Sequence, residues 1–260
     1  GNVLFNGIEQ LKGMQMAAQW TAKGLRIDSV HVEREDLNVE MSGLLQPNGD
    51  WPLALQGNIS LPAPDGKLLA LALKVDGNVR TTLNLTADTS GYLNAHIAGE
   101  LQPLADNLPA QLKITSEQFN PGFDLPDTLQ VEQLVLSAKG DLKDGYELNG
   151  SATLPAENTP VNLLLKGRVD ARGAQIAALQ LTSGPQQHLK LSGQVDWHQG
   201  LSAEAKIDWL EFPWHNLYPV IAKPDVDLRT FSGEVSYRDG NYLGNFKADL
   251  DGPAGKFSLS

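Results

Sequence analysis

The sequence predicts an all-β protein, built on an elongated, mostly antiparallel, curved sheet whose concave side is apolar. Three observations predict this fold. Apolar and polar residues alternate along most of the chain, glycines recur among the apolar positions, and Asn-Gly or Asp-Gly pairs separate many of the alternating runs. Alternation with a period of two places apolar side chains on one face of a strand and polar side chains on the other. We therefore expect the polar face of the sheet to be exposed to water.

The expected strands follow one another along the chain, in runs that helical spacing does not fit. Between the apolar residues stand mostly Asn, Gln, Lys, Thr, Ser and Asp. The runs lie at residues 14–22, 37–41, 53–61, 69–75, 83–85, 93–97, 112–114, 134–136, 146–154, 161–165, 179–181, 189–197, 203–209 and 242–250.

The expected turns are pairs of Asn or Asp followed by Gly, which tolerate positive φ and close two-residue hairpins. A tight hairpin joins only antiparallel strands, so these pairs favour a meander over a parallel β-helix. The pairs are Asn48-Gly49, Asp65-Gly66, Asp76-Gly77, Asp144-Gly145, Asp239-Gly240 and Asp251-Gly252.

Glycine repeatedly takes a position on the apolar face, as Gly193 does between Leu191 and Val195. A glycine inside a strand marks a bulge, a bend or a close approach of neighbouring backbone. We expect the sheet to bend at Gly57, Gly99, Gly140, Gly150, Gly167, Gly193 and Gly233. The residues expected to line the resulting apolar groove are Leu55, Ile59, Leu71, Leu73, Leu85, Ile97, Leu136, Leu148, Leu165, Val169, Leu191, Val195, Ile207, Phe231 and Val235.

The chain shows no break in composition, which favours one continuous unit over residues 1–260. Two segments, 103–127 and 208–227, interrupt the alternation, the first with several prolines. The second gathers Trp209, Phe212, Trp214 and Tyr218 in a short irregular or one-turn helical stretch. These aromatic residues either plug the end of a core or line a hydrophobic path, and core packing is the commoner role. Both chain ends still alternate, so we expect a piece of a longer β protein.

Composition and motifs exclude several classes of function. With Lys+Arg 20 against Asp+Glu 31 the net charge is -11, which opposes binding to nucleic acid and to anionic headgroups. The chain has no cysteine, and no apolar run approaches the length of a membrane span. His31 shares a strand parity with Glu33 and Glu35, but a solvated charged face explains this better than a metal site. No catalytic or cofactor-binding motif is present, so we expect neither an enzyme nor a cofactor.

The alternating runs at 163–169 and 189–197, each with a glycine in phase, and the interruption at 210–214 resemble the AsmA-like proteins. This resemblance implies a taco-like or U-shaped trough with an apolar interior, within a very long periplasmic protein of Gram-negative bacteria. It implies an inner-membrane anchor and an outer-membrane partner of the Omp85 type, both engaged through regions outside this chain. The implied role is phospholipid transport between the two membranes in support of outer-membrane biogenesis, with no catalytic residues.

The residues themselves are consistent with an acyl-chain ligand, because burying each CH₂ group is worth ~0.8 kcal/mol and requires no specific polar contact. An alternative is a structural β-sandwich or solenoid with a packed interior, acting in outer-membrane protein assembly or in adhesion through protein contacts. A carbohydrate-binding scaffold is less favoured, because Trp20, Trp197 and Trp209 lie on the apolar parity.

Overall fold

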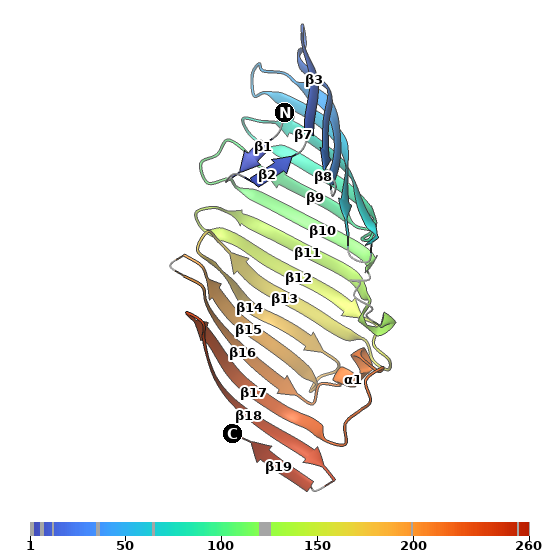
Figure 1. Ribbon diagram of the computed structural model, residues 1–260, viewed down its shortest axis with the longest axis vertical. Helices are drawn as coiled ribbons and strands as arrows, with labels where there is room; N and C mark the ends of the chain where they lie inside the picture. The colour runs from blue at the N-terminus through green and yellow to red at the C-terminus, as the bar shows by residue number, and fades with distance from the viewer. Residues whose placement is uncertain are drawn as a thin grey trace. The chain divides into compact units, whose positions relative to one another are not determined.

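A computed structural model describes residues 3–5, 8–11, 13–34, 37–63, 66–119, 126–198, 200–253 and 255–259 (Figure 1). The chain forms two compact units, residues 1–123 and 124–260, which are described separately below as unit 1 and unit 2. Helical structure in the described residues consists of the 3-10 turn η2 (Asp127–Leu129) and the short helix α1 (Trp214–Leu217). Among the described residues, no helix has both the length and the apolar character that crossing a membrane requires.

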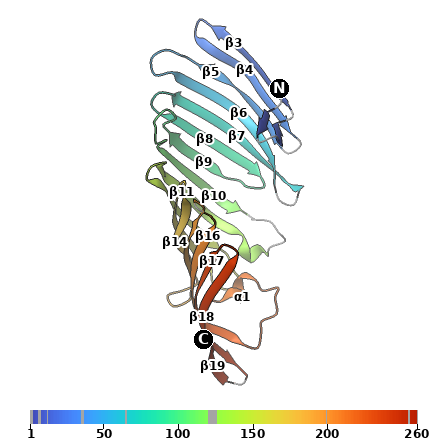
Figure 2. The ribbon, with the colours of Figure 1, turned by 60° about the vertical axis from the view of Figure 1, so that its left-hand side comes forward.

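Unit 1 is an antiparallel meander in which each strand pairs with the next (Figure 2). A separate two-stranded ribbon consists of β1 (Val3–Phe5) and β2 (Ile8–Leu11). The strands of the meander are β3 (Gly13–Thr21), β4 (Gly24–Arg34), β5 (Leu37–Leu45), β6 (Pro52–Pro62), β7 (Leu68–Asn78), β8 (Leu83–Gly91), β9 (His96–Leu101) and β10 (Ala110–Phe119).

Unit 2 repeats this arrangement, with η2 before its first strand and α1 between its sixth and seventh strands. All neighbouring strands are again antiparallel. The strands are β11 (Val131–Asp141), β12 (Gly145–Leu154), β13 (Val161–Val169), β14 (Gly173–Thr182), β15 (His188–Asp196), β16 (Ser202–Leu210), β17 (Asp227–Arg238), β18 (Asn241–Gly252) and β19 (Gly255–Leu259).

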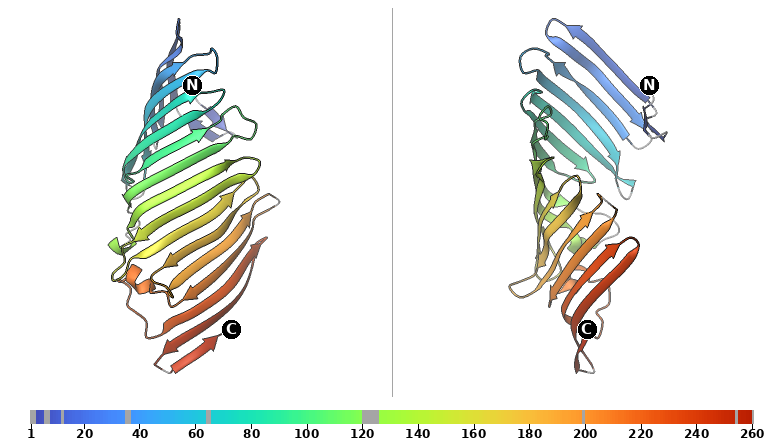
Figure 3. Two further views of the ribbon diagram at one scale, coloured as in Figure 1. Left: turned by 180° about the vertical axis from the view of Figure 1, so that it is seen from behind. Right: turned by 90° about the vertical axis from the view of Figure 1, so that its left-hand side faces the viewer.

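Each unit is an open, curved and twisted sheet, as the two views in Figure 3 show. The expected all-β, antiparallel and curved architecture is therefore confirmed. Whether the two units form one continuous trough, and whether its interior is apolar, stay predictions.

The expected two-residue hairpin turn at Asp239-Gly240 is confirmed by its backbone, whereas the turn before β12 takes in residues 142–144 and Gly145 already pairs with Asp141 inside the ladder. Asp239 and Gly240 form the turn between β17 and β18, with φ values of 51° and 82°. Asp144 closes the turn before β12, where the carboxylate of Asp141 accepts hydrogen bonds from the N–H groups of Lys143 and Asp144, at 2.9 and 2.7 Å. Side-chain acceptance of this kind replaces backbone pairing in a tight turn.

The expected turn at Asp76-Gly77 is wrong. Both residues lie inside β7, where Gly77 pairs with Leu53 on one side and Leu83 on the other. The chain turns later, where Thr81 N–H donates to the carbonyl of Asn78 at 3.1 Å. Gly77 has φ 124°, and a Cβ atom there would overlap the carbonyl oxygen of Thr82, so a close approach explains this glycine. Asp251-Gly252 likewise ends β18 instead of forming the turn.

The two expected interruptions differ in structure. Residues 103–109 form turns and loop, but strand β10 follows directly within the range 103–127. The second interruption holds α1 and irregular backbone between the end of β16 and the start of β17.

Candidate functional site: the apolar face of each sheet

The pairing register of unit 1 aligns its apolar residues in rows that cross the strands. Because residues directly opposite each other share a face, each row is a continuous strip on one side of the sheet. One row contains Val32, Val39, Ile59, Leu71 and Thr89. The next contains Met16, Val30, Met41, Gly57, Leu73, Ala87, Ile97 and Ile114. A third contains Ala18, Ile27, Gly43, Leu55, Val75, Leu85, Gly99 and Leu112.

Unit 2 has rows of the same kind. Its edge row contains Ala152, Leu163, Leu181, Leu189, Trp209, Phe231 and Ala248. The second row contains Leu136, Gly150, Leu165, Leu179, Leu191, Ile207, Gly233 and Phe246. The third contains Ala138, Leu148, Gly167, Ile176, Gly193, Ala205, Val235 and Gly244. The fourth contains Gly140, Tyr146, Val169, Ala174, Val195, Ala203, Tyr237 and Tyr242.

Every residue expected to line a groove, and every glycine expected to bend the sheet, stands in one of these rows. None of the rows contains a charged residue. The opposite face carries the residues expected to meet water: Lys74 is paired with Gln56, and Lys190 with Asp208. The register therefore brings the apolar residues of each unit together on one face, while their role in lining a groove stays a prediction.

This apolar face is only partly covered by the described residues. The expected lining residues are half-buried, and Val235 is 48% exposed. Several large apolar side chains on the same face are more exposed still, including Trp20 at 72% and Phe246 at 54%. A face of this size that packs against so little resembles a binding surface more than the inside of a closed core.

The glycines in the rows stand where neighbouring strands approach closely. A Cβ atom on Gly57 would overlap the carbonyl oxygen of Glu40, and one on Gly193 would overlap that of Glu204. At Gly167 the gap to the carbonyl oxygen of Gln175 would be 2.8 Å. At these positions an added side chain would meet the backbone of the next strand, so close approach of the strands explains why glycine stands there. The bending of the sheet at these glycines stays a prediction.

The aromatic segment, residues 211–218, covers part of the apolar face of unit 2. Phe212 and Leu217 are 4% and 7% exposed, and they form a cluster with Leu154 and Val161. Leu154 and Val161 follow the parity of the edge row, so this cluster lies on the apolar side of the sheet. Trp209 meets Phe212 edge to face, with ring centroids 5.4 Å apart. Core packing, the commoner of the two roles expected for this segment, thus describes these contacts.

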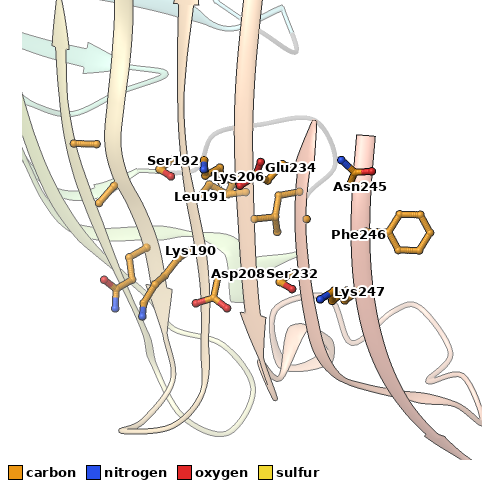
Figure 4. Close-up of a pocket in the computed structure, with 15 residues that line it drawn as sticks. Lys190, Leu191, Ser192, Lys206, Asp208, Ser232, Glu234, Asn245, Phe246 and Lys247 are labelled. Carbon is orange, nitrogen blue, oxygen red and sulfur yellow. Dashed lines mark hydrogen bonds and ion pairs between the residues drawn. The ribbon is translucent and has the colours of Figure 1, made fainter. Parts of the chain in front are cut away.

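The polar face of unit 2 holds a hollow of about 620 Å³, shown in Figure 4. Asn245 and Lys247 point toward the hollow, whereas Phe246 projects from the other side of β18. Lys206 pairs with Glu234 at 2.7 Å, and this hydrogen bond raises the pKa of the Lys206 ammonium. Two of the charged groups that line the hollow thus neutralise each other.

Two simple catalytic arrangements are relevant to the described residues of the polar face, a histidine bonded to a hydroxyl group and a metal cluster. His188 pairs with Asp208 at 3.0 Å, but no hydroxyl group of the described residues bonds to that imidazole. The part of the chain that the structure describes contains no group of three His, Cys, Asp or Glu residues able to hold a metal ion. Glu35 and the side chain of Glu33 lie outside the described residues.

Sequence patterns missed one component of this site. Val161 is fully buried and Leu154 nearly so, and both contact a segment about fifty residues further along the chain. Their alternation places them on the apolar face, but it contains no signal for a partner so distant in sequence. The useful signal was the concentration of aromatic residues in a loop, which aromatic residues rarely enter without packing.

Comparisons with known proteins give a consistent family. The family model described as TamB, N-terminal domain, matches residues 6–226. The chain is 27% identical over 150 residues to the translocation and assembly module subunit TamB of Haemophilus influenzae, covering 53% of this chain. The alignment spans only 12% of that relative. No solved structure matches the chain.

Proposed function

This chain belongs to the TamB family, and from that premise we propose that its apolar faces hold phospholipid acyl chains in transit between the inner and the outer membrane. The chain acts as one segment of a conduit across the periplasm, and this transport supports outer-membrane biogenesis. No cofactor and no catalytic residue takes part in this role.

The observation that carries the proposal is the set of uncharged rows on one face of each sheet. An acyl chain lying on such a face loses contact with water along its length, and each CH₂ contributes about 0.8 kcal/mol. A charge in its path would have to be desolvated, which is costly. Rows without charged residues therefore suit a ligand that slides past many side chains and needs no specific polar partner.

The proposal extends to the longer protein of which this chain covers a part. The two units are successive stretches of one trough, residues 1–260, and the glycines in the rows bend it around its apolar side. The whole protein is anchored in the inner membrane and reaches a TamA-like partner of the Omp85 type in the outer membrane, through regions outside this chain. The polar faces, with paired groups such as Lys206 and Glu234, meet the aqueous periplasm.

A second candidate is a scaffold that assists outer-membrane protein assembly through protein contacts. The name of the H. influenzae relative, translocation and assembly module subunit TamB, favours this second candidate. The buried cluster around Phe212 also shows that part of the apolar face packs against protein. On this alternative the remaining apolar face would bind a polypeptide instead of lipid.

Photo-crosslinking in cells distinguishes the two candidates. A photoreactive residue is placed in the full-length protein at Leu71, Leu73 or Leu85 on the apolar face, and at Lys74, Asn84 or His96 on the polar face. The conduit predicts phospholipid adducts from the first set and none from the second. Equal lipid capture from both faces, or polypeptide adducts alone from the apolar face, would overturn the conduit.

A further inference from the structure

The aromatic segment belongs to a buried cluster that contacts the edge row of unit 2 but not the second row. Leu181, Leu189 and Trp209 of the edge row pack against the buried cluster of Phe212, Leu217, Leu154 and Val161. Their same-face neighbours two residues along the same strands, Leu179, Leu191 and Ile207, belong to the second row and do not pack against this cluster. The limit of contact with the cluster therefore falls between two adjacent rows, whose side chains are half-buried on both sides of it.

Hydrogen bonds attach the aromatic segment to three other parts of unit 2. The Thr128 hydroxyl donates to the carbonyl oxygen of Leu217 at 2.7 Å, and the Glu157 N–H donates to that of Asn216 at 2.8 Å. At the other end, the Glu211 N–H donates to the carbonyl oxygen of Arg229 at 2.6 Å. The aromatic segment is thus hydrogen-bonded to η2, to the loop after β12 and to β17. Figure 1 shows the position of α1 at the edge of the sheet.

These hydrogen bonds and apolar contacts make the aromatic segment a fixed part of the fold. Leu181, Leu189 and Trp209 of the edge row already pack against the cluster that contains Phe212 and Leu217, so an acyl chain entering there would partly replace existing apolar contacts and gain less. It would also have to displace the segment and break its hydrogen bonds with Thr128 and Glu157. An acyl chain gains more on the second, third and fourth rows, where apolar surface is still exposed.

We propose that the aromatic segment sets the lateral limit of the lipid path in unit 2: Phe212 and Leu217 exclude acyl chains from the edge row and confine them to the second to fourth rows. This inference rests on the proposed lipid-binding function. It assigns to residues 211–218 the role of determining which part of the apolar face a lipid occupies.

Cysteine labelling with a lipid-like reagent tests this limit. Residues 1–260 contain no cysteine, so each variant carries a single thiol once any cysteine elsewhere in the full-length protein is replaced by serine. Leu189 and Leu191 lie on one strand and one face and are both half-buried, but of the two residues Leu189 packs against the cluster, so Leu189→Cys and Leu191→Cys form a matched pair. Each full-length variant is treated with a maleimide that carries a palmitoyl chain, and the adduct is counted by intact mass. We expect Leu191→Cys to react about ten times faster than Leu189→Cys, because access governs thiol labelling.

A second substitution tests whether the aromatic segment causes the difference in labelling rate. Adding Leu217→Ala should increase labelling of Leu189→Cys severalfold and leave that of Leu191→Cys unchanged. Thr128→Val, which removes only the hydroxyl bonded to Leu217, should have a smaller effect in the same direction and keeps the test informative if Leu217→Ala fails to fold.

Each result decides a different claim. Equal labelling of the two cysteines in the parent background, or faster labelling of Leu189→Cys, would overturn the lateral limit while leaving the proposed function standing. Failure of the reagent to label either cysteine would instead count against the proposed function, and the limit would fall with it.

Discussion

The two units share one strand pattern but differ in what lies on their apolar faces. Among the described residues of unit 1, the buried apolar side chains are only those of Ala87 and Ala95. In unit 2, Phe212 and Leu217 of the aromatic segment form a buried cluster with Leu154 and Val161 of the sheet. Alternation alone therefore builds a sheet with an uncovered apolar face, and a core forms only where a loop folds back over that face.

This difference implies different sources of stability. Unit 1 depends on its backbone ladders and on contacts between half-buried neighbours in the rows, each of which contributes roughly 0.2–1 kcal/mol. Unit 2 adds a compact apolar cluster, where the burial of each large side chain contributes about 1.5–3 kcal/mol. Charges on the apolar face should consequently be tolerated better in unit 1 than in the cluster of unit 2.

The largest expected effect contrasts a buried with a half-buried position. Val161→Asp places a carboxylate at a site with no exposure and should destabilise unit 2 by more than about 3 kcal/mol. Leu71→Arg in unit 1 should cost less than about 1.5 kcal/mol, because the long side chain can bring its charge to water. Urea unfolding of the two variants measures both values. Equal losses of stability would mean that unit 1 has a packed interior.

A smaller effect compares glycines of the two units. Gly57→Ala in unit 1 should destabilise by about 1–3 kcal/mol, because the new methyl group would overlap the carbonyl oxygen of Glu40. Gly150→Ala in unit 2 would meet the Leu165 Cβ at 3.2 Å and the movable Leu136 Cδ1 at 3.3 Å, a much milder approach, so its cost should be below about 1 kcal/mol. Thermal unfolding compares the pair. A larger cost at Gly150 would contradict this explanation of the glycine rows.

The smallest effect concerns the last strand of unit 2. Hydrogen bonds from Ser258 and Thr230 lower the pKa of the Asp249 carboxyl. A lowered pKa in the folded state contributes stability above the unfolded pKa of about 3.9, and this contribution disappears as the pH falls through the folded value. Ser258→Ala should therefore raise the pKa of Asp249 toward its ordinary value, as an NMR titration of that carboxyl would show. Ser232→Ala is the control and should leave the titration unchanged.

The strands were predictable where the alternation is uninterrupted. The expected run at 189–197 corresponds to β15, His188–Asp196, and the run at 203–209 to β16, Ser202–Leu210. No run was expected for β4, because the register shifts between Ile27 and Val30 and the apolar parity changes at that point. A bulge adds one residue to a strand and breaks the period on which such predictions depend.

The candidate site was predictable in its residues but not in its coverage. The alternation of apolar and polar residues placed Leu71 and Leu191 on the apolar face, because this alternation can be read from the local sequence alone. The burial of Val161 beneath Phe212 depends on a contact between β13 and a loop about fifty residues later, which no local period encodes. The bulge in β14 between Ile176 and Leu179 was missed for the same reason as that in β4.

The central claim is that the apolar rows hold phospholipid, and lipid mass spectrometry of the purified full-length protein tests it most directly. Leu71→Arg and Leu191→Asp place a charge in the rows, and Asn84→Lys and Lys190→Asp place one on the polar face. We expect phospholipid to co-purify with the parent protein and with both polar-face variants, and to be lost from both row variants, which should still accumulate as folded protein. Unchanged lipid in the row variants, or their failure to fold as in a closed core, would contradict the claim.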